Sequence, residues 1–99
     1  MTHEKLKWET LVRHIALDTN NLFFTKHVLQ RMQQRQISRQ FVYEVLRKGV
    51  IRRQPEPDLK TGHTQCRMER VIAGQKLGIV IAIENPSATT GIVITAMDL

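Results

Sequence analysis

The spacing of apolar residues changes halfway along the chain, and this change constrains the fold more than any other feature. Up to about residue 49 the apolar residues recur at the three- and four-residue intervals of amphipathic helices. Beyond that point they alternate, as in Leu77, Ile79, Ile81 and Ile83. Ninety-nine residues suffice for one small domain. The order predicts an α+β fold, with N-terminal helices packed on a roughly four-stranded antiparallel sheet.

Three helices are expected in the first half, over about residues 4–17, 26–35 and 39–48. Thr25 and Ser38 are suited to cap the second and third helices, because a hydroxyl accepts a free N–H of the first turn. Gly49 is expected to take the left-handed conformation that often ends a helix. Residues 22–24 are apolar enough for a short strand or for a hydrophobic contact that leads into the second helix.

Four strands are expected in the second half, over about residues 50–54, 64–73, 76–84 and 92–97. Pro55 and Pro57 should end the first of these strands, since proline has no N–H to donate to a sheet. Gly74 and Gln75 are expected to form a tight hairpin turn. The third strand is apolar on both faces, which predicts a central strand covered by the helices on one side.

Positive charge is concentrated in one segment. The chain has 15 Lys and Arg against 9 Asp and Glu, a formal net charge of +6. Segment 26–53 contains one acid, Glu44, and eight basic residues: Lys26, Arg31, Arg35, Arg39, Arg47, Lys48, Arg52 and Arg53. Such concentration favours a phosphate-bearing partner, and the alternative is a solvated helix face.

His27, Arg31 and Arg35 are spaced at i, i+4 and i+8, so they share one side of the second helix. Stacked cations repel one another unless an anion lies among them, and arginine suits phosphate oxygens. Histidine transfers protons near neutral pH. The three residues are therefore candidates for holding an RNA phosphate during cleavage; the alternative is three exposed polar side chains. Arg31 has a further alternative, an ion pair with Glu44 or Glu69.

Several classes of protein and site find no support. The single cysteine, Cys66, cannot form an internal disulfide, and no stretch approaches the roughly 20 apolar residues of a membrane span. The N-terminus does not resemble a secretory signal, so a soluble cytoplasmic protein is expected. His63 and Cys66 have metal-compatible spacing but lack a second ligand pair. Neither a metal nor a cofactor is expected, and Cys66 is interpreted as a core residue.

The run from Thr25 to Ser38, TKHVLQRMQQRQIS, resembles a motif of a small bacterial family in the RelE/BrnT-like toxin superfamily. That motif is T-x-H-A-x-x-R-M-x-x-R-G-I-S, and this chain departs from it at Val28, where alanine is usual, and Gln36, where glycine is usual. The family's L-x-x-G and V-I-T segments correspond to residues 46–49 and 93–95. The resemblance covers about residues 23–97. It divides the chain into an N-terminal helical extension, 1–22, and a RelE/BrnT-like domain, 23–99.

The resemblance implies a RelE-like fold, metal-independent endoribonuclease activity on mRNA, and a cognate antitoxin as a protein partner. By the logic of such nucleases, His27 is the candidate base or acid, and Arg31 and Arg35 are the candidate stabilisers of the phosphorane charge. The candidate nucleic-acid-binding residues are Lys26, Arg39, Arg52, Arg53, Arg67 and Thr95.

Other assignments stay open at this point. Arg67, Glu69 and Thr95 are candidate substrate contacts on the strands, and each is alternatively an ordinary cross-strand surface residue. The alternative function is a non-catalytic interaction module of the same fold, which binds nucleic acid or an acidic protein.

Overall fold

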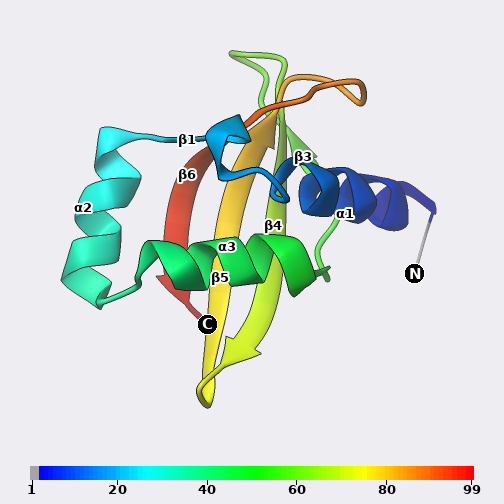
Figure 1. The fold of residues 1–99 in the computed structure, drawn as a ribbon. Helices are drawn as coiled ribbons and strands as arrows, with labels where there is room; N and C mark the ends of the chain where they lie inside the picture. Colours follow the sequence, from blue (N-terminus) through cyan, green and yellow to red (C-terminus); the bar gives the residue numbers. More distant parts are fainter. Residues whose placement is uncertain (1–2) are drawn as a thin grey trace.

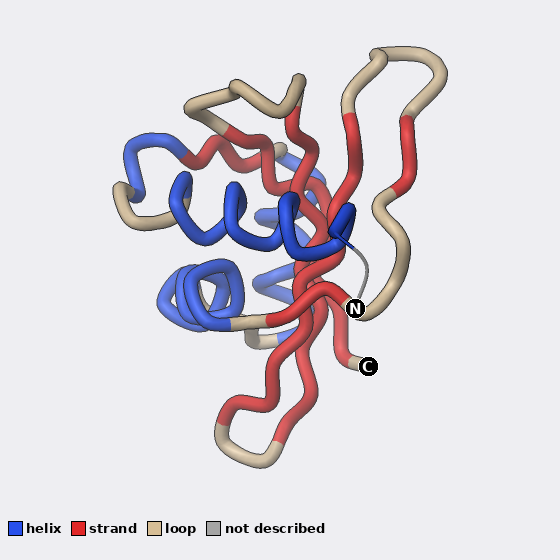
Figure 2. The backbone as a smooth tube through the Cα atoms, turned by 90° about the vertical axis from the view of Figure 1, so that its right-hand side faces the viewer, coloured by secondary structure: helices blue, strands red, loops and turns tan. Residues whose placement is uncertain are grey.

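The computed structural model describes residues 3–99, in which three α-helices lie on one side of a six-stranded mixed sheet (Figures 1 and 2). The elements are α1 (His3–Ile15), the 3-10 turn η1 (Thr19–Asn21), β1 (Leu22–Phe24), α2 (Lys26–Arg35), α3 (Arg39–Lys48), β2 (Val50–Ile51), β3 (Glu56–Pro57), β4 (Thr64–Ile72), β5 (Gln75–Ile83) and β6 (Gly91–Asp98). The predicted α+β class and the order of its elements are confirmed.

The sheet has the strand order β1-β6-β5-β4-β2, and β3 also pairs with β4. Strands β2, β4, β5 and β6 form the predicted antiparallel set. The expectation of a purely antiparallel four-stranded sheet is wrong, because β1 adds a parallel edge strand beside β6 and β3 adds a short antiparallel pairing. Three residues suffice for β1 because Leu22 is buried and the Thr25 N–H extends the pairing to the Val93 carbonyl at 3.3 Å.

Both predicted helix caps are present. The Thr25 hydroxyl accepts the Val28 N–H at 3.1 Å, and the Ser38 hydroxyl accepts the Phe41 N–H at 3.2 Å. Each cap satisfies one of the free N–H groups that a helix leaves at its first turn. The starts of α2 and α3 were therefore determined by local sequence.

Gly49 does not take the predicted left-handed conformation. Its φ is −73°, and a Cβ at this position would lie 2.4 Å from the Val45 carbonyl oxygen and 2.9 Å from that of Glu69. Glycine is required here because two backbones approach closely, not because of its dihedral freedom. The left-handed residue is instead Gln36, the C-cap of α2, with φ 57°.

Two strand boundaries also differ from expectation. The β4–β5 hairpin turns at Ala73 and Gly74, which have φ values of 52° and 78°, one residue earlier than predicted. Strand β2 covers only Val50 and Ile51 of the expected 50–54, since its pairing with β4 ends after Ile51. The segment that follows β2 pairs with β4 again only at β3, through Glu56 and Pro57.

The hydrophobic core fills the space between the helices and the sheet. It includes side chains from all three helices and from the long strands, among them Trp8, Val12, Ile15, Val28, Met32, Val42, Leu46, Met68, Leu77, Ile79, Ile81 and Val93. Helix α1 thus packs into the same core as the rest of the chain, although it belongs to the predicted extension. Residues 1–2 of that extension lie outside the described residues.

The sheet face opposite the helices is uncovered by any helix of residues 3–99 (Figure 2). Side chains of a strand alternate between faces, so the neighbours of core residues such as Ile79 and Ile81 project to this second face. We call it the open face. The register places Gln65, Arg67 and Glu69 of β4, Gly78, Val80 and Ala82 of β5, and Ile92, Thr95 and Met97 of β6 on it.

Candidate functional site

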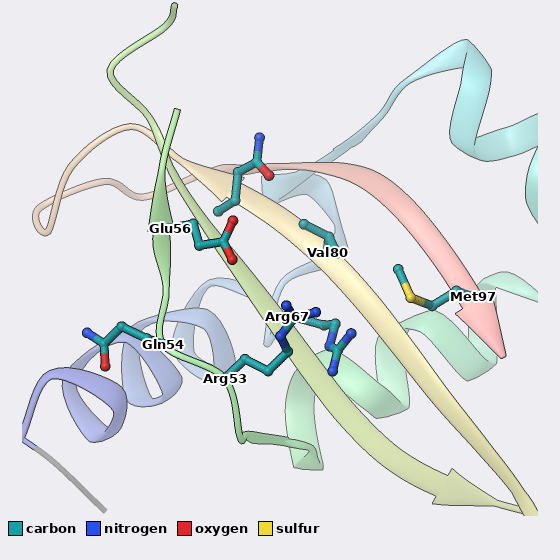
Figure 3. Close-up of a pocket in the computed structure, with 7 residues that line it drawn as sticks. Arg53, Gln54, Glu56, Arg67, Val80 and Met97 are labelled. Atoms are coloured by element: carbon teal, nitrogen blue, oxygen red, sulfur yellow. The ribbon is translucent and has the colours of Figure 1, made fainter. Parts of the chain in front are cut away.

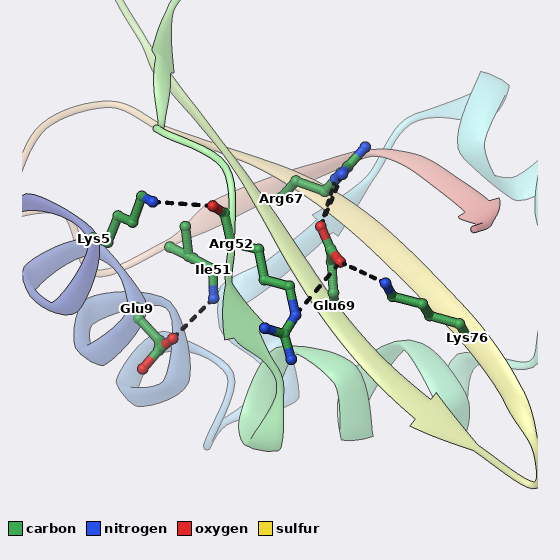
Figure 4. A network of polar contacts seen from close by, with 7 residues as sticks. All are labelled: Lys5, Glu9, Ile51, Arg52, Arg67, Glu69 and Lys76. Carbon is green, nitrogen blue, oxygen red and sulfur yellow. Dashed lines mark hydrogen bonds and ion pairs between the residues drawn. The ribbon is translucent and has the colours of Figure 1, made fainter. Parts of the chain in front are cut away.

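Glu69 is the centre of a charged cluster on the open face (Figure 4). Its side chain is only 3% exposed, and Nε and Nη2 of Arg67 both donate to its Oε2, at 3.1 and 2.8 Å. Lys76 Nζ lies 3.6 Å from Oε1, and Arg52 Nε lies 4.0 Å from the same atom. Three cations therefore surround one buried carboxylate. The cluster has more positive charge than Glu69 neutralises.

A pocket of about 120 Å³ opens beside this cluster (Figure 3). The segment after β2 supplies one wall, and the strands supply the other wall and an apolar floor. Its lining residues are Arg53, Gln54, Glu56, Gln65, Arg67, Val80 and Met97. Arg67 belongs to both the pocket and the Glu69 cluster, so the two form one site.

Glu69 fixes one edge of the Arg67 guanidinium. Arg67 uses Nε and Nη2 for Glu69, whereas Nη1 makes no hydrogen bond within residues 3–99. Its side chain is 22% exposed, and it lies over the apolar residue Val80, its register partner on β5. A guanidinium fixed by a carboxylate on one edge loses less freedom when its other edge binds an oxyanion. Together with Arg53, Arg67 gives the pocket two cationic donors.

The predicted catalytic residues lie on a different element. His27, Arg31 and Arg35 are all exposed on α2, and none forms a hydrogen bond or ion pair with another described residue. None of them lines the pocket. They form the ridge that their spacing predicted, because Val28 and Met32 take the buried side of the helix.

Of the two alternatives left open for Arg31, the structure shows the exposed side chain and not an ion pair with Glu44 or Glu69. Glu44 pairs with Arg70, with Nε 3.0 Å from Oε2, and Glu69 is occupied by the cations described above. Arg70 reaches α3 because it follows Glu69 on β4 and therefore leaves the opposite face of the sheet. Alternation along β4 decides which arginine meets which acid.

The predicted nucleic-acid-binding residues divide between the two sides of the sheet. Arg52, Arg53, Arg67 and Thr95 lie at the open face or at its rim. Arg39 lies on the helix side, where its guanidinium carbon stacks 4.4 Å from the centroid of Phe24. Lys26 is exposed at the first turn of α2.

Several residues of the site were not found from the sequence. Lys76, Gln54, Glu56, Gln65 and Met97 were not singled out, and Glu69 was only one candidate contact among three. The Arg67-x-Glu69 spacing was a usable signal, since residues two apart in a strand share a face. Lys76 joins them from the neighbouring strand β5, where it pairs with Val71, so only the register of the two strands brings it near Glu69.

Cys66 lies on the helix side of β4 and is fully buried. Burial raises the pKa of its thiol to about 12, because the apolar surroundings disfavour the thiolate. The thiol is consequently protonated at neutral pH and is no nucleophile there. Among residues 3–99, no group of three His, Cys, Asp or Glu side chains is placed to hold a metal ion.

Within residues 3–99, no helix is both long and apolar enough to cross a membrane. No curated protein and no solved structure matches the chain. Residues 24–98 match a protein family described as a domain of unknown function (DUF4258). The match begins after α1 and includes the helices α2 and α3, the strands β2 to β6 and every residue of the pocket. Since it covers most of the chain, this protein belongs to the DUF4258 family.

Proposed function

We propose that this protein is a RelE/BrnT-like toxin that binds RNA along the open face of its sheet, cleaves it without a metal ion, and is neutralised by a cognate antitoxin. One observation carries the proposal. The buried carboxylate of Glu69 gathers Arg52, Arg67 and Lys76 beside a pocket that Arg53 also lines.

The chemistry of this cluster suits a nucleic-acid backbone. A buried carboxylate with three cations leaves surplus positive charge at the surface, and each phosphate bound there releases condensed counterions from the RNA. The guanidinium fork of Arg67 fits phosphate oxygens, and its orientation is already fixed by Glu69. The apolar floor of Val80 and Met97 supplies a surface for a nucleobase next to the phosphate.

Helix α2, which bears the ridge of His27, Arg31 and Arg35, packs beside β6, the strand that contributes Met97 to the pocket. In Figure 1, α2 runs beside β6 in the same direction, and α3 lies in front of the sheet. Val28 and Met32 are buried and α2 packs against β6, so His27 and Arg31 lie on a side of α2 that is turned away from the core. An RNA strand that leaves the pocket across β6 would meet α2.

The proposed reaction needs two proton transfers and one stabilised charge. A base removes the proton of the 2′-hydroxyl, the freed oxygen attacks the phosphorus, and the departing 5′-oxygen takes a proton from an acid. We assign His27 to one of these proton transfers. Arg31 and Arg35 are assigned to the negative charge that develops on the phosphorane oxygens.

Induced expression in a bacterial host tests the proposal. The wild type is expected to arrest growth and fragment RNA, whereas His27→Ala and Arg67→Ala accumulate as folded protein without arrest. Arg70→Ala is the matched control, because it removes the same charge from β4 on the helix side. Growth arrest by His27→Ala equal to that of the wild type would remove His27 from the mechanism. Intact RNA and normal growth with soluble wild-type protein would refute the nuclease.

A second candidate function is a non-catalytic module that binds RNA on the same face. It is favoured by the absence of any histidine among the residues that line the pocket. Purified protein separates the two functions: binding of a short single-stranded RNA without cleavage supports the module, whereas cleavage that depends on His27 supports the toxin.

A further inference from the structure

Three charged side chains of α1 bind the backbone beside β2. Lys5, Glu9 and Arg13 occur at i, i+4 and i+8 and therefore form one ridge of the helix. Lys5 Nζ donates to the Arg52 carbonyl at 3.0 Å, and Arg13 Nη2 donates to the Gly49 carbonyl at 2.7 Å. Between them, Glu9 Oε1 accepts the Ile51 N–H at 2.8 Å. Figure 4 shows the Lys5 and Glu9 contacts.

The charges of this ridge match the polarity of the backbone they contact. Two cations bind the carbonyl oxygens of Gly49 and Arg52, and the single anion binds the N–H between them. The overall spans are comparable as well, because the eight residues from Lys5 to Arg13 rise about 12 Å along the helix and the three residues from Gly49 to Arg52 extend about 10 Å. Helix α1 thus takes the place of a neighbouring strand along the outer edge of β2.

Glu9 is the central member of this ridge. The residue is 4% exposed, and its second carboxylate oxygen lies 3.5 Å from Arg13. A buried carboxylate is costly unless it is paired and hydrogen-bonded, and both conditions are met here. Loss of Glu9 would leave the Ile51 N–H without its acceptor and would remove the ion pair of Arg13, which would keep only its hydrogen bonds to the Gly49 carbonyl.

We propose that α1 is a clamp that positions the cationic wall of the open-face site, with Glu9 as its principal positioning residue. The proposal rests on RNA binding at that site. Strand β2 has only two residues, too few to hold their register by pairing alone. The residues that follow it are Arg52, which pairs with Glu69, and Arg53, which lines the pocket. A clamp on Ile51 and Arg52 therefore determines where both guanidinium groups lie.

Two pairs of variants test the clamp. Glu9→Ala removes the acceptor of the Ile51 N–H, whereas Glu9→Gln retains an oxygen at the same place, and both change the net charge equally. Lys5→Ala removes the contact with the Arg52 carbonyl, and Lys7→Ala removes the same charge from an exposed position of α1. Each variant is measured at a temperature where circular dichroism shows it folded. The readouts are amide hydrogen exchange at Ile51 and affinity for a short single-stranded RNA at low salt.

The clamp predicts that the Ile51 amide exchanges at least about tenfold faster in Glu9→Ala than in Glu9→Gln, because it loses a hydrogen bond to a charged acceptor. It also predicts severalfold weaker RNA binding by Glu9→Ala than by Glu9→Gln, and by Lys5→Ala than by Lys7→Ala. Unchanged affinity in folded Glu9→Ala, despite fast exchange at Ile51, would overturn the positioning role.

The clamp and the proposed function fail in different ways. If wild-type protein does not bind RNA, RNA binding at the open face is refuted, and the exchange rate at Ile51 still decides whether Glu9 holds the backbone. If Glu9→Ala does not fold, the comparison of Lys5→Ala with Lys7→Ala decides the positioning role. Equal RNA affinity of those two variants would then contradict it.

Discussion

The two faces of the sheet are built from the same strands and differ in almost every property. On the helix side, Leu77, Ile79 and Ile81 of β5 are all fully buried. Alternating with them on the open face are Gly78, Val80 and Ala82, whose short side chains leave room for the long side chains of β4. The helix side therefore provides stability, and the open face provides charge and access. The difference shows that one alternating strand can serve a core and a binding surface at once.

The burial of Cys66 on the helix side of the sheet should make its thiol far less reactive in the folded protein than in the unfolded chain. Its thiol has a pKa of about 12 in the fold against 9.0 when exposed, so about a thousandfold less thiolate is present at pH 8 than in the unfolded chain. We expect iodoacetamide to leave native protein unmodified over a time in which denatured protein is fully alkylated. Rapid alkylation of the native protein would mean that the helix layer opens readily.

Truncation of neighbouring residues on β5 should lower the free energy of unfolding by different amounts on the two faces of the sheet. Ile79→Ala is expected to lower the free energy of unfolding by about 2–5 kcal/mol, since it leaves a cavity under the helices. Val80→Ala, on the half-buried open face, should cost only about 1 kcal/mol. Urea unfolding followed by circular dichroism measures both. Equal losses would contradict the assignment of the two faces.

Removal of one arginine from each face of the sheet should change RNA binding by different amounts. Arg67→Ala is expected to weaken RNA binding and to reduce the slope of log K against log salt by about 1, because one phosphate contact is lost. Arg70→Ala removes an equal charge together with the ion pair to Glu44 on α3. Its salt slope should stay near that of the wild type in fluorescence anisotropy titrations. Similar slopes for the two variants would place the RNA elsewhere.

A small gain of stability is expected at the end of α2, on the rim of the molecule. Gln36 has φ 57°, where a Cβ is unfavourable, so Gln36→Gly should raise the free energy of unfolding by about 0.5–1 kcal/mol. Gln30→Gly, within the same helix, should lower it by a similar amount. A thermal unfolding curve that shows a loss for Gln36→Gly would indicate that its side chain contributes to the native state.

Much of the fold was predictable because its signals are local. The hydroxyl caps at Thr25 and Ser38 and the alternation along β5 depend on residues close in sequence. Gly49 was misread in part because one of the two carbonyls that crowd it belongs to Glu69, twenty positions away in the chain. Strand β1 was left open for the related reason that a parallel partner, β6, gives no signal near residues 22–24.

The candidate site was predictable only in part. The α2 ridge followed from helical spacing, and the structure places His27, Arg31 and Arg35 on one exposed side as expected. Their catalytic role remains a prediction. The Glu69 cluster required the register of β4 against β5 and the path of the segment after β2, neither of which the sequence specifies.

By itself, the sequence determined the class of fold, the starts of two helices, the apolar side of each element and the concentration of positive charge. These features depend on the period of the backbone and on side chains within about four residues of one another. The tertiary structure alone decided that Arg67 meets Glu69 while Arg70 meets Glu44, and that α1 binds the edge of β2. Such pairings depend on strand register and on the packing of distant segments, where a shift of one residue moves a side chain to the other face.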